Sequence, residues 1–180
     1  MAQLHSRRLF LGLAAAAIAP PALSSASNPW APRDISARER VNLRTFMSGL
    51  QRDIPEVAGQ TDILDDHVRL RLMEDSLFQT GTADLHPEGV RLLTLIAARM
   101  LRHPVRMEAV AHHHSDGQSY RSFIISQRRA QAVRAAMLSR SIPDANLLAT
   151  GLGENFPIAT NHTASGRATN RRVDLLFRTH

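Results

Sequence analysis

Two short stretches in which apolar and polar residues alternate limit the folds that this chain can adopt. The first lies in HVRLRL at residues 67–72, and the second is VRMEAVAHH at residues 105–113. Alternation with a period of two places the apolar side chains on one face of the backbone, which is typical of a half-buried β-strand. We therefore predict two strands of a sheet that packs one face against a core.

A helical pattern follows each of these strands. The first carries Pro87 near its first turn and ends before Pro104; its apolar stripe consists of Val90, Leu93, Ile96, Ala97, Met100 and Leu101. The second runs from Tyr120 to Arg140, with Ser119 as the expected N-cap. Residues 141–153 then predict a turn and a third strand, and residues 171–177 predict a fourth strand.

The expected order is therefore strand, helix, strand, helix, strand, strand. Right-handed crossovers make strands that are joined through helices parallel, and they place those helices on the same side of the sheet. This order predicts an α/β protein, in detail an α+β sandwich of βαβαββ order. Both helices should pack on one face of a mixed four-stranded sheet within a folded domain at residues 67–180.

A further helix is expected before this domain. Between Ile35 and Leu50, apolar residues recur at intervals of three and four, and Pro55 should stop the helix. We assign residues 35–66 to this helix and a linker. Residues 27–34, SNPWAPRD, are rich in proline and polar residues and predict a tether.

The first 26 residues have the features of an export signal. Arg7 and Arg8 precede the apolar run LFLGLAAAAIA, and small residues ending at Ala26 suit signal peptidase. A bilayer crossing needs about 20 apolar residues, so we expect cleavage and no transmembrane segment in the mature chain. SRRLFLG resembles a twin-arginine signal, with a general secretory signal as the alternative. Either route places the mature protein in the periplasm.

The composition limits the kinds of binding or catalytic site that the chain can form. All 22 basic residues are arginine, whose guanidinium binds carboxylates and phosphates bidentately. The chain has no cysteine, which excludes disulfides, thiolate metal sites and a lipid anchor on an N-terminal cysteine. Known nucleophile, metalloprotease and nucleotide-binding motifs are also missing from the sequence. We expect neither enzymatic activity, a cofactor nor a nucleic-acid partner.

Three sequence blocks carry a family resemblance. They are LFQTGTADLHPEG at 77–89, SQRRAQAV at 126–133 and ATGLGENFPIATNHTASGRATNRRVDLLF at 149–177. In this order and spacing they resemble the OmpA-like C-terminal domain over residues 68–177. The resemblance implies the βαβαββ sandwich and non-covalent binding of peptidoglycan through its stem peptide.

Arg129 is the first candidate for ligand binding. On a helical wheel it falls inside the apolar stripe of its helix, and its side chain should lean back toward the loop at residues 114–117. An arginine placed there needs an anion. The resemblance implies that Arg129 holds a carboxylate of the stem peptide, usually that of diaminopimelate. The alternative is a buried ion pair with Asp116 that fixes the loop.

The sequence departs from the family where the resemblance implies an aspartate that accepts the ammonium of diaminopimelate. This chain has His114 there, and a histidine supplies no negative charge. Asp116 is the nearest carboxylate that can replace it. The resemblance adds Ser122, Asn170 and Arg171 to the ligand-binding candidates. His112 and His114 share a strand face, but the chain offers no convincing third ligand, and we expect no metal site.

Two functions remain open at this point. The first is an exported cell-envelope protein that binds the peptidoglycan stem peptide, with an affinity that the change to His114 weakens. The alternative is a degenerate OmpA-like domain that acts as a scaffold for a protein partner in an envelope complex.

Overall fold

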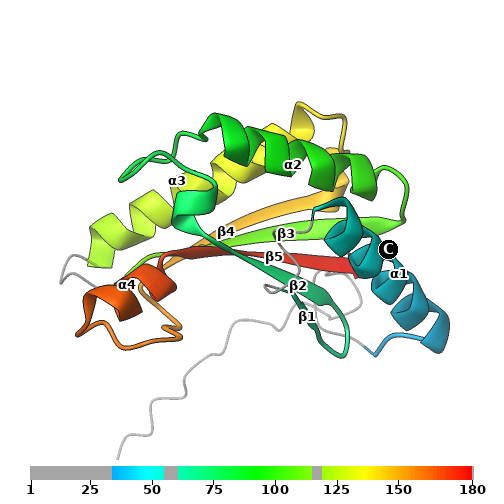
Figure 1. Cartoon of the computed structure of the whole chain (residues 1–180), viewed down its shortest axis with the longest axis horizontal. Coiled ribbons are helices and arrows are strands. Elements are labelled where there is room, and N and C mark those ends of the chain that lie inside the picture. Colours follow the sequence, from blue (N-terminus) through cyan, green and yellow to red (C-terminus); the bar gives the residue numbers. More distant parts are fainter. Residues whose placement is uncertain (1–33, 55–60, 115–118, 180) are drawn as a thin grey trace, which may run out of the picture. The chain divides into compact units, whose positions relative to one another are not determined.

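A computed structural model describes residues 34–54, 61–114 and 119–179 (Figure 1). The predicted signal peptide at 1–26, nearly all of the tether at 27–34 and the loop that contains Asp116 lie outside these residues. The elements in chain order are α1 (Ala37–Asp53), β1 (Thr61–Ile63), β2 (Val68–Met73), the 3₁₀ turn η3 (Glu74–Ser76), α2 (Pro87–Met100), β3 (Val105–His112), α3 (Ser119–Leu138), the 3₁₀ turn η4 (Asp144–Asn146), β4 (Leu147–Gly153), α4 (Ala164–Asn170) and β5 (Arg172–Thr179).

The strands form one mixed sheet in the order β1-β2-β5-β3-β4. Strands β3 and β4 are parallel, and the other neighbouring pairs are antiparallel. Because β5 is antiparallel to both β2 and β3, these two helix-connected strands run in the same direction, as predicted. The predicted count of four strands is wrong by one, since β1 adds an edge strand to β2. Its three residues are too few to show an alternating pattern, so the sequence placed them in the linker.

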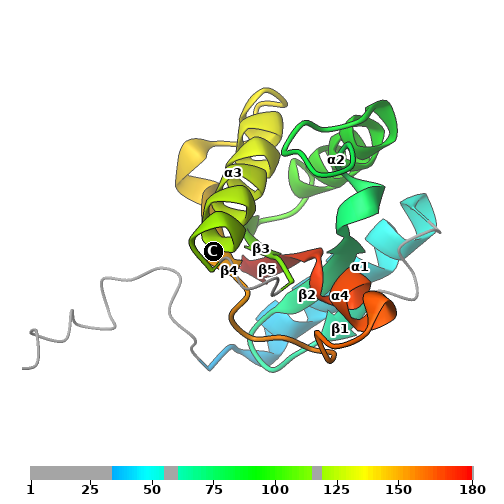
Figure 2. The same cartoon turned by 90° about the vertical axis from the view of Figure 1, so that its left-hand side faces the viewer.

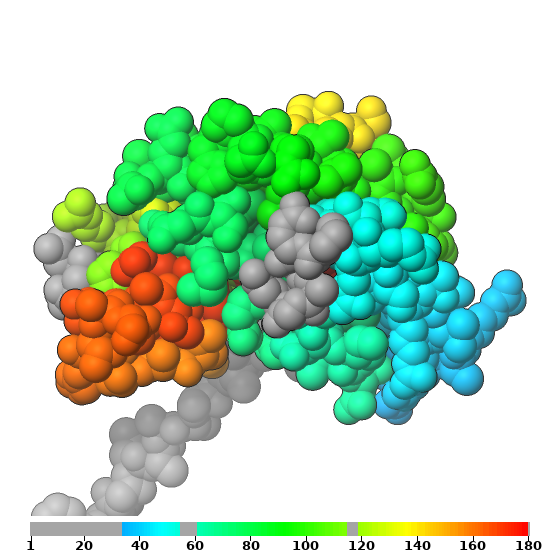
Figure 3. All heavy atoms as spheres, viewed as in Figure 1, coloured from blue at the N-terminus to red at the C-terminus, as the bar shows by residue number. Residues whose placement is uncertain are grey.

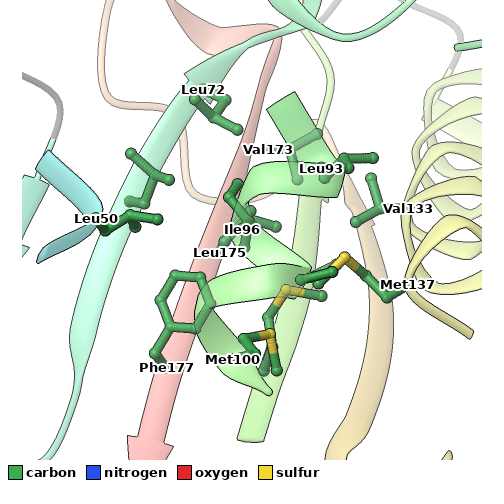
Figure 4. Packing of buried hydrophobic residues seen from close by; sticks show 14 of the residues in the cluster. Leu50, Leu72, Leu93, Ile96, Met100, Val133, Met137, Val173, Leu175 and Phe177 are labelled. Atoms are coloured by element: carbon green, nitrogen blue, oxygen red, sulfur yellow. The ribbon is translucent and has the colours of Figure 1, made fainter. Parts of the chain in front are cut away.

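Helices α2 and α3 cover one face of the sheet (Figures 1 and 2). The inward side chains of the alternating strands meet the apolar stripes of the helices in one core, where Leu72, Val173 and Leu175 face Leu93, Ile96 and Val133 (Figure 4). The opposite alternating positions, including Arg69 and Arg71, lie on the face without helices. The predicted periodicities therefore correspond to the observed layers, except that Val90 and Leu101 of the predicted helical stripe are exposed and Leu92 is buried instead.

Helix α1 packs on the same core. A capping box between Ser36 and Glu39 starts it. Its Phe46 ring lies 4.9 Å from the ring of Phe177 on β5, and Arg99 of α2 donates to the carbonyl of Thr45 at 3.1 Å. These contacts show that the helix packs on its own domain.

Helix α4 was not predicted. Thr163 is the N-cap of this short helix, and its side chain accepts a hydrogen bond from the Gly166 amide at 3.0 Å. The helix is short and mostly polar or small, so it shows no apolar stripe. Helix α4 leads the chain into β5 beside the end of β2. There the backbone carbonyl of Arg171 accepts a hydrogen bond from the Glu74 amide at 3.0 Å.

Candidate functional site

A cleft of about 610 Å³ opens where the segment after β2, the end of β3, helix α3 and the start of β5 meet. In the space-filling view the residues after β2 and the start of β5 adjoin one another on the visible face (Figure 3). The described residues that line the cleft are Glu74, Asp75, Thr80, Gly81, His113, His114, Arg121, Ile124, Ile125, Arg128, Arg129 and Arg171. The predicted candidates His114, Arg129 and Arg171 are therefore brought together.

Arg129 forms a bidentate ion pair at the base of this cleft. Only 1% of the residue is exposed, so the prediction that it avoids open solvent is confirmed. Its Nη1 and Nη2 donate to the two carboxylate oxygens of Glu74 at 2.6 and 2.7 Å, and its Nε donates to the Thr82 carbonyl at 2.8 Å. The ion-pair alternative named Asp116 as the partner, but among the described residues the partner is Glu74.

Glu74 is not among the predicted site residues, because its pair with Arg129 spans 55 positions in the chain. The one signal was an acidic residue directly after the alternating strand, where the chain must turn. That position is buried here, with 4% of Glu74 exposed. Only the order of strands in the sheet brings it under helix α3.

The surroundings keep Glu74 ionised. Burial favours the neutral acid, but the hydrogen bond with His113 and the positive charges of Arg129 and Arg171 outweigh it, so the pKa of Glu74 lies below its ordinary value. Burial lowers the pKa of Arg129 while the charge of Glu74 opposes that shift. Arginine nevertheless remains protonated in proteins. The cleft therefore has a fixed, charged base.

The lining of the cleft carries an excess of positive charge. Among the described residues of the lining, four guanidiniums face two carboxylates, which leaves four minus two, or two positive charges, before the histidines are counted. Arg121 and Arg128 are exposed, and Arg171 is half-buried with its Nε 3.6 Å from a Glu74 oxygen. Such a concave, positively charged surface attracts anions.

Two imidazoles complete the wall. The rings of His113 and His114 lie 4.4 Å apart, and Nδ1 of His113 is 3.8 Å from Glu74 and 3.4 Å from Nη1 of Arg129. His114 thus lies in the cleft, where the resemblance places an aspartate. Within the described ranges, no group of three or more histidine, aspartate or glutamate side chains is arranged to hold a metal ion.

Ser122 and Asn170 are not among the residues that line the cleft. Ser122 is buried and donates to the His114 carbonyl at 3.3 Å, which fixes the end of β3. Asn170 is 1% exposed; its Oδ1 accepts from two backbone amides, and its Nδ2 donates to the Ala159 carbonyl and to the Asn161 side chain. Both side chains shape the loops around the site.

Helices in the described parts of the chain are all too short or too polar to cross a membrane.

The chain matches a family model described as OmpA family over residues 77–171. It is 31% identical to the probable lipoprotein YiaD of Escherichia coli over 111 residues, which are 61% of this chain and 51% of that protein. It is 36% identical to outer membrane protein A of Bordetella avium over 104 residues, 56% of this chain and 53% of that protein. The chain thus spans about half the length of these relatives.

Solved structures share the fold. A putative MotB-like protein from Desulfovibrio vulgaris superposes with a TM-score of 0.68 at 23% identity, covering 79% of this chain and 98% of that one. The cell wall anchor of the T6SS from Pseudomonas aeruginosa superposes with a TM-score of 0.64 at 26% identity, covering 73% of this chain and 97% of that one.

Proposed function

Since this chain belongs to the OmpA family, we propose that its folded domain binds peptidoglycan non-covalently in the periplasm, through a carboxylate of the stem peptide. The observation that carries the proposal is the cleft at the ends of β2 and β3, whose described lining residues have two positive charges in excess. An anionic group on an extended polymer is the ligand that such an open, arginine-rich cleft favours.

The arginines have different roles in this proposal. Arg129 donates from Nε to Thr82 and from both terminal nitrogens to Glu74. It therefore stabilises the base of the cleft and adds its positive charge to the electrostatic field there. Arg121, Arg128 and Arg171 have more exposed guanidiniums. These three supply the direct hydrogen bonds to the ligand carboxylate.

The names of similar proteins support the proposal. A relative in Pseudomonas aeruginosa, 30% identical over 62% of this chain, is a peptidoglycan-associated lipoprotein. The similar solved structure from the same species is a cell wall anchor.

His114 sets the strength of this binding. A diaminopimelate side chain presents an ammonium beside its carboxylate, and the described wall of the cleft offers it an imidazole at position 114. The carboxylate contact therefore dominates, and binding is weaker than it would be with an aspartate there.

Co-sedimentation of the mature protein with purified peptidoglycan sacculi tests the proposal. The wild type should sediment, and Arg121→Gln/Arg171→Gln should remain largely in the supernatant. The matched control is Arg91→Gln on α2, which removes an exposed guanidinium paired with Glu88 outside the cleft. If the folded wild type stays in the supernatant, the domain serves instead as a scaffold for an envelope protein partner.

A further inference from the structure

The face of the sheet without helices carries a second cleft, of about 500 Å³. It lies on the opposite side of β2, β3 and β5 from the core and is bounded by the loop after β4. Its lining combines arginines with apolar side chains; the described lining residues are Leu64, His67, Arg69, Arg71, Val110, His112, Phe156, Pro157, Ile158, Arg172, Asp174 and Leu176. The proposed peptidoglycan site uses none of them.

The charges in this cleft do not balance. Asp174 accepts from Nε of Arg71 at 3.0 Å and from Nε of Arg172 at 3.2 Å, so one carboxylate serves two guanidiniums. Arg69 pairs with Asp62 at the edge of the sheet. Among the described residues, the three guanidiniums of the lining are paired with Asp174 of the lining and with Asp62 outside it, so three minus two leaves one positive charge beside the cavity.

One of the positively charged groups of this cleft, Arg172, is buried. Arg172 is 3% exposed, and its Nη2 donates to the Phe156 carbonyl at 3.2 Å. Its Nη1 is buried without a hydrogen-bond partner among the described residues. A buried donor without a partner destabilises a protein, and a second anion at the cleft would relieve both this cost and the excess charge.

The loop that closes the cleft holds an exposed aromatic ring in a strained conformation. Phe156 is 69% exposed and has φ of 59°, a region that bulky residues rarely adopt. Ile158 is also exposed beside it. Strain of this kind persists where the surrounding structure enforces it, and it gathers at binding sites. An exposed Phe156 at the mouth of the cleft offers an apolar surface to a ligand.

We propose that this second cleft binds a peptide segment of a partner protein in which one carboxylate neighbours an apolar side chain. The single positive charge in excess matches a monoanion, and Asp174 disfavours a dianion such as phosphate. The carboxylate lies against Arg71 and Arg172, and the apolar side chain packs on Phe156 and Ile158. The domain thereby holds a partner on one face while the other cleft remains open.

N-acetylphenylalanine is a minimal probe, because it joins one carboxylate to one apolar ring. Titrated into the isotopically labelled mature protein, it should cause saturable NMR shifts in residues 155–158 and 172–174. N-acetylphenylalanine amide has the same ring without the charge and should bind there at least about tenfold more weakly. Equal binding of acid and amide at these residues, or shifts confined to the cleft around Arg129, would overturn the proposal.

Two variants locate the contacts. Asparagine tolerates positive φ, so Phe156→Asn should fold normally and weaken binding of the acid about tenfold. Phe123→Asn removes an exposed ring on α3 outside the cleft and should leave affinity unchanged. Arg71→Gln leaves Arg172 paired with Asp174 and should make acid and amide bind alike.

Both cleft variants should still sediment with sacculi, which separates this inference from the proposed peptidoglycan site. Loss of sacculus binding in folded Phe156→Asn would show that this face belongs to the peptidoglycan site, and the inference would be wrong.

Discussion

At the scale of single residues, the cleft depends on the buried pair of Arg129 and Glu74. A guanidinium that is 1% exposed and bound at 2.6 and 2.7 Å to one carboxylate has a structural role whatever else it does. Breaking a buried pair by removing one partner leaves the other charge buried and unpaired, which is strongly destabilising. The pair therefore links the stability of the domain to the shape of its site.

Arg129→Ala should lower the free energy of unfolding by about 3 to 5 kcal/mol, because Glu74 loses its bidentate partner. Chemical denaturation of the purified protein measures the change. Arg128→Ala, an exposed neighbour on the same helix, is the matched control and should shift stability little. A loss below about 1 kcal/mol in Arg129→Ala would contradict the structural role of the pair.

His114→Asp should strengthen binding to sacculi or to free diaminopimelate by roughly ten- to a hundredfold, since a carboxylate there can accept the ligand ammonium. Calorimetric titration gives the affinity. His113→Asp is the instructive comparison, because its carboxylate would face Glu74 and should not help. If Asp116 already accepts the ammonium, His114→Asp should change little and Asp116→Asn should be the damaging variant.

At the scale of elements, sequence periodicity predicted the helices and strands that are long and amphipathic. The strands from Val68 and Val105 and the two long helices are in place, because burial of one face imposes a regular pattern on the sequence. Ser119, the expected N-cap, is instead the first residue of α3, and its hydroxyl donates to Glu154. Strand β1 and helix α4 have too few residues for a pattern. Glu74 was missed for a related reason: the contact depends on strand order, and a local pattern does not encode it.

One contact between elements depends on the absence of a side chain. A Cβ on Gly151 of β4 would lie 2.3 Å from the backbone nitrogen of Gln127, so this glycine lets α3 approach the sheet. Gly151→Ala should push the helix outward and lower the free energy of unfolding by about 1 to 3 kcal/mol. Thermal unfolding and sacculus binding should both weaken; an unchanged melting temperature would show that α3 adjusts without cost.

At the scale of the whole molecule, the face of the sheet without helices contains a buried histidine whose surroundings disfavour its charged form. On the face without helices, His112 is 5% exposed, with Nε2 3.7 Å from Asp174 and Nδ1 3.4 Å from the Asn155 carbonyl. Burial and the charges of Arg172 and Arg71 lower its pKa to about 4, against the opposing effect of Asp174. His112 is therefore neutral in the folded protein at neutral pH.

This shift makes stability depend on pH. Between pH 6.5 and about 4 the unfolded chain binds a proton at His112 that the folded protein does not, so stability falls as the pH falls through this window. The loss amounts to about 3 kcal/mol by pH 4. The lowered pKa of Glu74 removes further stability at more acidic pH.

Denaturation curves between pH 4 and 7 measure this dependence. His112→Asn should flatten it, whereas His162→Asn, which changes an exposed histidine in the loop before α4, should retain the wild-type slope. A wild-type slope in His112→Asn would assign the pH dependence to other groups.

The position of β5 has a consequence for how the chain folds. Of the described strands, the one that fills the middle of the sheet comes last in the sequence, and its Asp174 meets Arg71 across 103 positions. Until it arrives, β2 and β3 have no common neighbour and the core face of the sheet stays open to water. High contact order of this kind slows folding. A segment that stops short of β5 therefore lacks the central strand that the domain needs in order to close.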